Sequence, residues 1–160
     1  MKIFSANSLD ALSEVALASP RRRMNFNVHG SYLDSCQRFF NAIEPESYIR
    51  PHRHLSDDRD ELLIAVRGIM ALVVFDDVGS PARVIRFGSE KYKESLAVGV
   101  EVSSSAWHTV VSLLSGSILL EVKSGPFDPE KSKDKALWAP DEFSPAAPSY
   151  QKWLISLAAA

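Results

Sequence analysis

The stretch YIRPHRH places two of the chain's four histidines two residues apart. In an extended strand alternate residues share a face, so His52 and His54 are expected to point the same way, together with Tyr48 and Arg50. Pro51 favours an extended conformation before it and lacks a backbone N–H, which indicates an edge or irregular strand. Two imidazoles side by side at the rim of a sheet would form half of a metal site.

A carboxylate and a third histidine occur at usable positions further along the chain. After the polar loop LSDDRD, Glu61 precedes the apolar run LLIAVRG, which predicts a hairpin returning antiparallel to the histidine strand. His108 begins the apolar run WHTVVSL after a small-residue turn. Imidazole and carboxylate bind divalent Fe, Mn, Zn or Ni and leave positions open for substrate or water. The sequence predicts one divalent ion held by His52, His54, Glu61 and His108.

These residues need a β-rich framework, and from residue 47 onward short apolar runs alternate with turn residues. Such runs predict consecutive antiparallel strands of a sandwich or barrel. The runs are SYIR, LLIAV, IMALVVF, ARVIRF, VGVEV, WHTVVSL and SILLEV. Gly68 and Gly116 fall at expected hairpin turns, where glycine tolerates a positive φ without steric cost.

Two earlier segments have the apolar spacing of helices. The first is NSLDALSEVALASP, with Asn7 or Ser8 as its cap and Pro20 as its stop. The second is SYLDSCQRFFNAI, in which Cys36, the sole cysteine, falls in the apolar stripe and is expected to be buried rather than nucleophilic.

The proline-rich segment after the last run predicts an irregular strap anchored by Trp138, followed by a short helix near residues 150–158. We expect a single domain of residues 1–160, divided into a helical N-terminal segment (1–45), a barrel (46–124), and the strap with its C-terminal helix (125–160).

Composition narrows the classes of function. Apolar residues make up 46% and charged residues 24%, as in an ordinary globular protein, and a net charge of -2 gives no basic field for nucleic acid or anionic membrane. No stretch approaches the ~20 apolar residues of a membrane span, and one cysteine allows no intrachain disulfide. A cytoplasmic protein with a small polar or anionic ligand is expected.

The ligand spacing resembles the cupin superfamily. Its first motif is a histidine pair, a glutamate, and a glycine after six intervening residues; its second ends in a histidine before a buried strand. In this chain SSSAWH resembles the second motif, and the first is matched by His52, His54, Glu61 and Gly68. The resemblance implies an all-β cupin barrel, a double-stranded β-helix or jelly roll, with a bound metal.

The chain departs from the cupin pattern at Glu46, Ser103 and Ser105, which stand where glycine or proline is usual, and the loop before Glu61 is longer. The ligand carboxylate is therefore assigned to Glu61 on its spacing to the glycine, with Asp57 or Asp58 left open as alternatives.

Several segments in one order resemble the WbuC-type cupin metalloproteins, whose genes occur among bacterial surface-polysaccharide functions. They are SPRRRMNFNVH, YIRPHRH, DELLIAVRG, WHTVVSL and SGPFDPEKSKDKALWAPDE. The resemblance implies a role in O-antigen or lipopolysaccharide synthesis, on a sugar or sugar-nucleotide intermediate. It also implies a homodimer, as in many cupins.

The expected reaction is a metal-dependent isomerisation or epimerisation, in which the ion polarises a carbonyl and Arg50 holds the substrate's anionic group. The base would be His29, Tyr48 or metal-bound hydroxide. Arg23 and Asn27 are further substrate-binding candidates. An Fe(II)-dependent dioxygenase and a non-catalytic sugar-binding or regulatory module are the alternatives.

Overall fold

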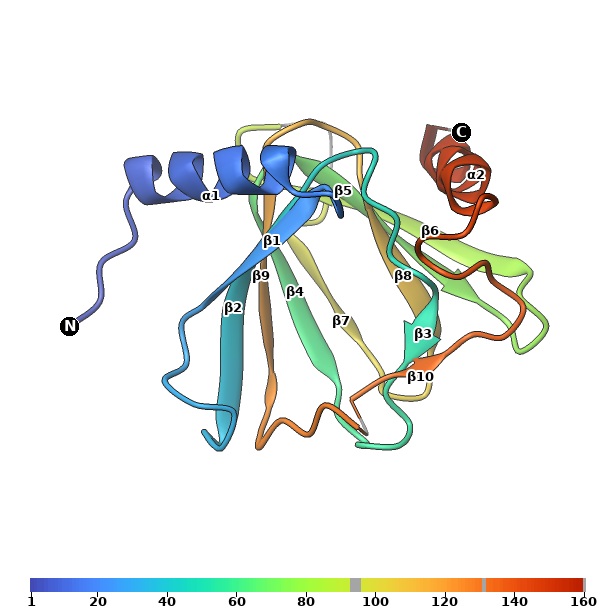
Figure 1. The fold of residues 1–160 in the computed structure, drawn as a ribbon, viewed down its shortest axis with the longest axis horizontal. Helices are drawn as coiled ribbons and strands as arrows, with labels where there is room; N and C mark the ends of the chain where they lie inside the picture. Colours follow the sequence, from blue (N-terminus) through green and yellow to red (C-terminus); the bar gives the residue numbers. More distant parts are fainter. Residues whose placement is uncertain (93–95, 131, 160) are drawn as a thin grey trace.

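The computed structural model describes residues 1–92, 96–130 and 132–159, whose strands form two antiparallel five-stranded sheets (Figure 1). The first sheet has the order β1 (Arg23–Asn27), β2 (Cys36–Ile43), β9 (Ser117–Ser124), β4 (Glu61–Arg67) and β7 (Gly99–Val102). The second has the order β10 (Asp134–Lys135), β3 (His52–Arg53), β8 (Trp107–Ser112), β5 (Ile69–Phe75) and β6 (Pro81–Gly88). The expected all-β architecture is confirmed.

The main apolar core lies between the two sheets. Leu63 and Leu119 contribute from the first sheet, while Leu72, Phe87 and Val110 contribute from the second, and all five are buried. Because side chains alternate along a strand, the neighbours of these residues face outward. The outer face of each sheet therefore needs its own cover.

Two helices of 13 residues cover these outer faces, on opposite sides of the barrel (Figure 1). The first, α1 (Ala6–Ala18), begins at a capping box in which Ser5 and Ser8 bond each other's backbone, and it packs on the first sheet. The second, α2 (Ala147–Ala159), packs on the second sheet. Among the described residues, no helix is long and apolar enough to cross a membrane.

The expected second helix is wrong, because that segment forms β2. The strand pairs with β1 on one side and β9 on the other. Ile43 points into the main core, whereas Phe40 packs beneath α1. Apolar residues on both faces of a strand remove the period-two pattern and leave a spacing that imitates a helix. Cys36 is thus the half-buried first residue of a strand.

The boundaries of the expected segments shift accordingly. The first strand begins at Arg23, inside the part expected to be helical, and α1 is the one helix among residues 1–45. The histidine strand is limited to β3, so residues 47–50 do not form the strand predicted there. The other six predicted strands are confirmed within one or two residues. Gly68 and Gly116 have the expected positive φ, +73° and +74°, but each joins strands of different sheets, so the predicted hairpins are wrong.

The strap passes over the outer face of the second sheet, and Trp138 anchors it as expected. Its ring packs on Phe75 with 5.0 Å between ring centroids. A Cβ at Gly79, which has a φ of +88°, would lie 2.6 Å from the same indole. The close approach of backbone to ring therefore requires glycine at this position.

A buried arginine also fastens the strap. Arg23, whose side chain is 8% exposed, lies with Nη2 2.8 Å from Oε1 of Glu142, and it donates to the Ser47 hydroxyl and the Tyr48 carbonyl. Arg21 binds the same carboxylate at 2.8 Å. Partial burial by itself would raise the pKa of Glu142, but hydrogen bonding from Arg21 and the charge of Arg23 outweigh it and lower the pKa.

We expect Glu142→Gln to reduce the free energy of unfolding by about 1–3 kcal/mol at pH 7, since it leaves a buried guanidinium without its counter-charge. The lowered pKa means that this contribution is present above the ordinary glutamate pKa and is lost as the pH falls through the folded value. Urea unfolding of wild type and variant between pH 3 and 7 measures this.

The control for this substitution is Glu14→Gln, on the exposed face of α1. It should change stability by less than about 0.5 kcal/mol. An equal effect of the two substitutions would contradict a specific role for the Arg23–Glu142 pair.

Candidate metal centre

Three histidines from one sheet meet a glutamate from the other. His52 in β3 and His108 in β8 are cross-strand partners, and His54 follows β3 directly. Glu61 is the first residue of β4, in the opposite sheet, and the predicted hairpin between the histidine strand and β4 is therefore wrong. The carboxylate reaches the imidazoles across the barrel interior.

Each imidazole is oriented by a backbone carbonyl. Nδ1 of His52 lies 3.0 Å from the oxygen of Arg50, and Nδ1 of His108 lies 2.9 Å from that of Ala106. Nδ1 of His54 lies 2.5 Å from the oxygen of Ser132 in the strap. A carbonyl can only accept, so we assign the ring proton to Nδ1 in all three residues. Each Nε2 is left with a lone pair, the form in which imidazole binds metals.

The four side chains suit a divalent cation. Their ligand atoms lie within 4.8 Å of one another, and each residue is at most 6% exposed. Glu61 Oε2 is 3.1 Å from Nε2 of His54 and 3.5 Å from Nε2 of His108, while Nε2 of His54 has no hydrogen-bond partner in the part of the chain that the structure describes. Electron-pair donors that meet away from water are unfavourable unless a cation lies among them. The donor set therefore fits a metal ion.

The protonation states agree with this role. Burial, followed by the positive charge of Lys133 and the neighbouring His108, holds the pKa of His52 well below its usual range. Burial would raise the pKa of Glu61, but the adjacent His108 and His54 rings outweigh it and hold the pKa well below its usual range. Neutral imidazole and ionised carboxylate are the forms that ligate, so little proton loss is needed at His52 and Glu61 on binding.

A buried lysine beside the cluster was missed by the sequence analysis. Nζ of Lys123 lies 3.4 Å from Oε1 of Glu61 and 3.3 Å from Oδ2 of Asp57. It thus directs the other oxygen of Glu61 toward the histidines. Asp57 forms an ion pair with the lysine, and Asp58 accepts a hydrogen bond from the Ser104 hydroxyl at 3.0 Å. The geometry favours Glu61 over either aspartate as the ligand.

A cavity of about 150 Å³ opens beside the cluster. Its polar walls include Glu61 and Lys123 of the site, together with Asn27 and His29. Glu121 also borders it, and Asn41 Nδ2 donates to Glu121 Oε1 at 3.0 Å. Burial, followed by the negative charge of Glu61, raises the pKa of Glu121. A second carboxylate that is not a ligand therefore faces the same space.

The predicted substrate-binding residues separate into two groups. Asn27 and His29 line the cavity, as a site role requires. Tyr48 and Arg50 do not: the Tyr48 hydroxyl donates to the Pro140 carbonyl, and Arg50 binds the strap at the Ala136 carbonyl and at Asp141.

Because residues 47–50 do not form a regular strand, the expected common face of Tyr48 and Arg50 with the histidines is lost. Arg23 is likewise committed to Glu142 and lies outside the cavity.

A signal for the missed residues was present in SILLEVKS, the sequence of β9. Leu119, Glu121 and Lys123 alternate along one strand, and Leu119 belongs to the core. Two charged residues on the core-facing side of an apolar strand indicate a polar interior site, because isolated charges are rarely buried.

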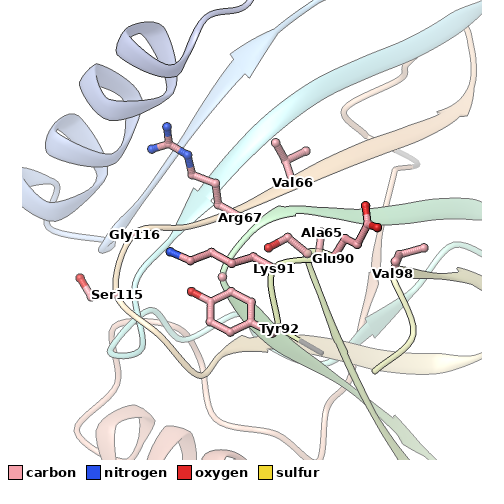
Figure 2. Close-up of a pocket in the computed structure, with 11 residues that line it drawn as sticks. Ala65, Val66, Arg67, Glu90, Lys91, Tyr92, Val98, Ser115 and Gly116 are labelled. Carbon is pink, nitrogen blue, oxygen red and sulfur yellow. The ribbon is translucent and has the colours of Figure 1, made fainter. Parts of the chain in front are cut away.

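A larger cavity of about 800 Å³ lies at the other end of the barrel (Figure 2). It is bordered by Arg67, Lys91, Tyr92 and Ser115 but by none of the four candidate ligands. Glu61 and Arg67 are the two ends of β4, roughly 20 Å apart at the usual rise of a strand. Arg67 itself is bound to Asp10 at 2.5 Å. The chemistry therefore belongs to the smaller cavity.

Comparison with known proteins gives the family. Residues 4–87, more than half of the chain, match the family described as Domain of unknown function (DUF6016). The chain belongs to the DUF6016 family. No protein of curated function matches this DUF6016 chain.

Solved structures of similar fold are cupins. The chain is similar to KdgF from Halomonas sp., with 13% identity, a TM-score of 0.51, and coverage of 70% of this chain and 86% of that one. A cupin 2 domain-containing protein from Halorhodospira halophila has 15% identity, a TM-score of 0.50, and coverage of 86% and 81%. Protein SO0799 from Shewanella oneidensis has 10% identity, a TM-score of 0.59, and coverage of 96% of each chain.

At these identities the similarities establish the fold alone. The DUF6016 chain has the all-β cupin jelly roll that the sequence predicted, and its buried histidines and glutamate form a candidate metal site. The finer resemblance to WbuC-type cupins stays a prediction.

We expect wild-type protein purified without an affinity tag to carry one divalent ion per chain. His54→Ala and His108→Ala should each weaken metal binding by at least about 100-fold, because each removes a ligand whereas loss of an outer partner already costs 10–100-fold. Metal content by mass spectrometry, with circular dichroism to verify folding, measures this.

The fourth histidine supplies the matched control. His29 lies outside the ligand cluster, so His29→Asn should keep its metal. Equal metal content in folded wild type, His54→Ala and His108→Ala would disprove the ligand assignment.

Proposed function

We propose that this protein is a metal-dependent enzyme that transfers a proton on a small polar molecule, as an isomerase or epimerase. The supporting observation is the cavity in which Glu61 of the metal cluster lies beside a second carboxylate, Glu121, that is not a ligand. A bound divalent ion would supply Lewis acidity, which polarises a carbonyl or hydroxyl oxygen.

Glu121 is the proton-transferring group that these residues favour. Asn41 fixes one of its oxygens, and the raised pKa brings the carboxyl closer to neutral pH, where an acid–base group is most efficient. His29 is the other candidate, since it also lines the cavity. Tyr48, the third residue considered, lies beneath the strap.

The size of the cavity limits what enters it. About 150 Å³ is less than the roughly 300–1,000 Å³ of pockets for drug-sized ligands. A small molecule fits, or the reacting end of a larger one. With the WbuC resemblance, this supports a sugar, or the sugar end of a sugar nucleotide, in bacterial surface-polysaccharide synthesis. A cytoplasmic homodimer is part of the same proposal.

An Fe(II)-dependent dioxygenase is the second candidate. Three histidines and one carboxylate leave coordination positions for dioxygen and substrate. The additional carboxylate in the cavity favours proton transfer over this alternative, because dioxygenation does not require a second acid–base group.

Solvent exchange tests the proposal. Metal-loaded protein in D₂O should exchange a carbon-bound proton next to the carbonyl of one of a panel of keto and aldehydo sugars and sugar nucleotides, followed by proton NMR. Glu121→Gln should slow this exchange by roughly 10²- to 10⁴-fold, the usual contribution of a general acid or base, at unchanged metal content. Glu101→Gln, at the exposed position of β7, is the control.

The alternatives give different results. Uptake of O₂ with Fe(II), without proton exchange, would identify a dioxygenase. Stabilisation of the fold by a sugar, without exchange or O₂ uptake, would identify a binding module. If Glu121→Gln exchanged the carbon-bound proton as fast as wild type, a residue other than Glu121 would be the base.

A further inference from the structure

His29 borders the cavity and carries an unused hydrogen-bond donor. The backbone N–H of Arg38 donates to Nδ1 of His29 at 3.0 Å. Nδ1 also lies 2.8 Å from the Arg38 carbonyl, but that oxygen already accepts the N–H groups of Val28 and His29. We therefore assign the ring proton to Nε2. This atom is buried without a hydrogen-bond partner among the described residues, in a residue only 7% exposed.

A buried N–H without a partner is unfavourable by about 1–3 kcal/mol, so it calls for an acceptor. His29 borders the cavity beside the metal cluster, and it is not one of the four candidate ligands. An acceptor bound in this cavity is the partner that the fold leaves room for.

Positive charge also gathers at the cavity. Lys133, an exposed residue of the strap, borders it, and no ion-pair partner of Lys133 occurs among the described residues. Its charge therefore lies at the same cavity as Glu61 of the cluster. Lys123, by contrast, is already paired with Asp57 and Glu61.

Once a divalent ion is bound, the positive charges outweigh the negative ones. The total positive charge comes from the ion, Lys123 and Lys133. It exceeds the total negative charge of Glu61, Asp57 and Glu121, even when every carboxylate is ionised. A cavity with this balance of charge and an unpartnered N–H donor in its wall is suited to an anionic oxygen, because charge-assisted hydrogen bonds are stronger than neutral ones.

We propose that the cavity binds the oxyanion end, a carboxylate or phosphate group, of a small substrate, and that His29 and Lys133 select it. The inference rests on the proposed function, because it places this group beside the reacting centre. His29 and Lys133 thus take the role that the sequence analysis gave to Arg50, because the Arg50 side chain is bound to the strap.

Glycolate and its uncharged amide, glycolamide, probe this selection because they differ in charge and little in size. Titration calorimetry on metal-loaded wild type should show tighter binding of glycolate. Lys133→Gln should weaken glycolate binding about three- to fivefold, as expected for an exposed charge. His29→Asn, which retains a polar atom near the Arg38 N–H, should weaken it about tenfold.

The matched control is Lys135→Gln, two residues along the same exposed strap and outside the cavity lining. It should leave glycolate affinity within about twofold. The wild-type affinity should fall with added salt, and this dependence should be smaller in Lys133→Gln. A carboxylate that merely coordinated the ion would be insensitive to both Lys133→Gln and His29→Asn.

Inorganic phosphate, titrated in the same way, distinguishes the two oxyanions. Tighter binding of phosphate with the same dependence on Lys133 and His29 would identify a phosphoryl group. Equal binding of glycolate and glycolamide, or equal effects of Lys133→Gln and Lys135→Gln, would overturn the inference while the metal site stands. Failure of wild type to bind a divalent ion would overturn the proposed function and this inference with it.

Discussion

The candidate site depends on four electron-pair donors held together where water does not reach them. Three imidazole nitrogens and one carboxylate oxygen converge in the barrel, and their arrangement is favourable only around a cation. The backbone keeps the three Nε2 atoms free to bind a cation, since each ring donates its Nδ1–H to a carbonyl of Arg50, Ala106 or Ser132. The hydrogen bonds behind the ligands, as much as the ligands, determine what the site can bind.

The barrel interior changes character along its strands. In β9, Leu119 lies in the apolar core, whereas Glu121 and Lys123 border the polar cavity further along the same face. Burial of a lysine is unfavourable unless its charge is paired, and Asp57 and Glu61 supply that pairing. The apolar core between the sheets thus provides stability, and the end that carries the metal cluster provides the charges for chemistry.

The C-terminal strap is part of the site as well as a cover for the sheet. The Ser132 carbonyl orients His54, and the neighbouring Lys133 borders the cavity. Trp138 and Glu142 fix the strap to the barrel through Gly79 and Arg23. The family match of residues 4–87 contains His52, His54 and Glu61 but none of these strap residues. The strap residues that orient His54 and border the cavity therefore lie outside the matched part of the chain.

Local patterns determined much of the fold. Short β-rich runs between turn residues were enough to predict six strands and the positive φ of Gly68 and Gly116, because alternation and positive φ are local properties. The predicted hairpins were wrong, because each glycine joins two sheets. The second helix failed for a tertiary reason: β2 is covered on both faces, by α1 and by the barrel interior, which removes the local signature of a strand.

The same division applies to the site. The types and spacing of His52, His54, Glu61 and His108 were enough to predict a metal cluster from the sequence. The sequence did not show that Glu61 approaches from the opposite sheet, or that the Arg50 side chain hydrogen-bonds to the strap. Nor did it show which polar residues border the cavity. Ligand chemistry is a property of residue types, whereas those contacts join residues far apart in the chain, and only the packing of two sheets and a strap brings them together.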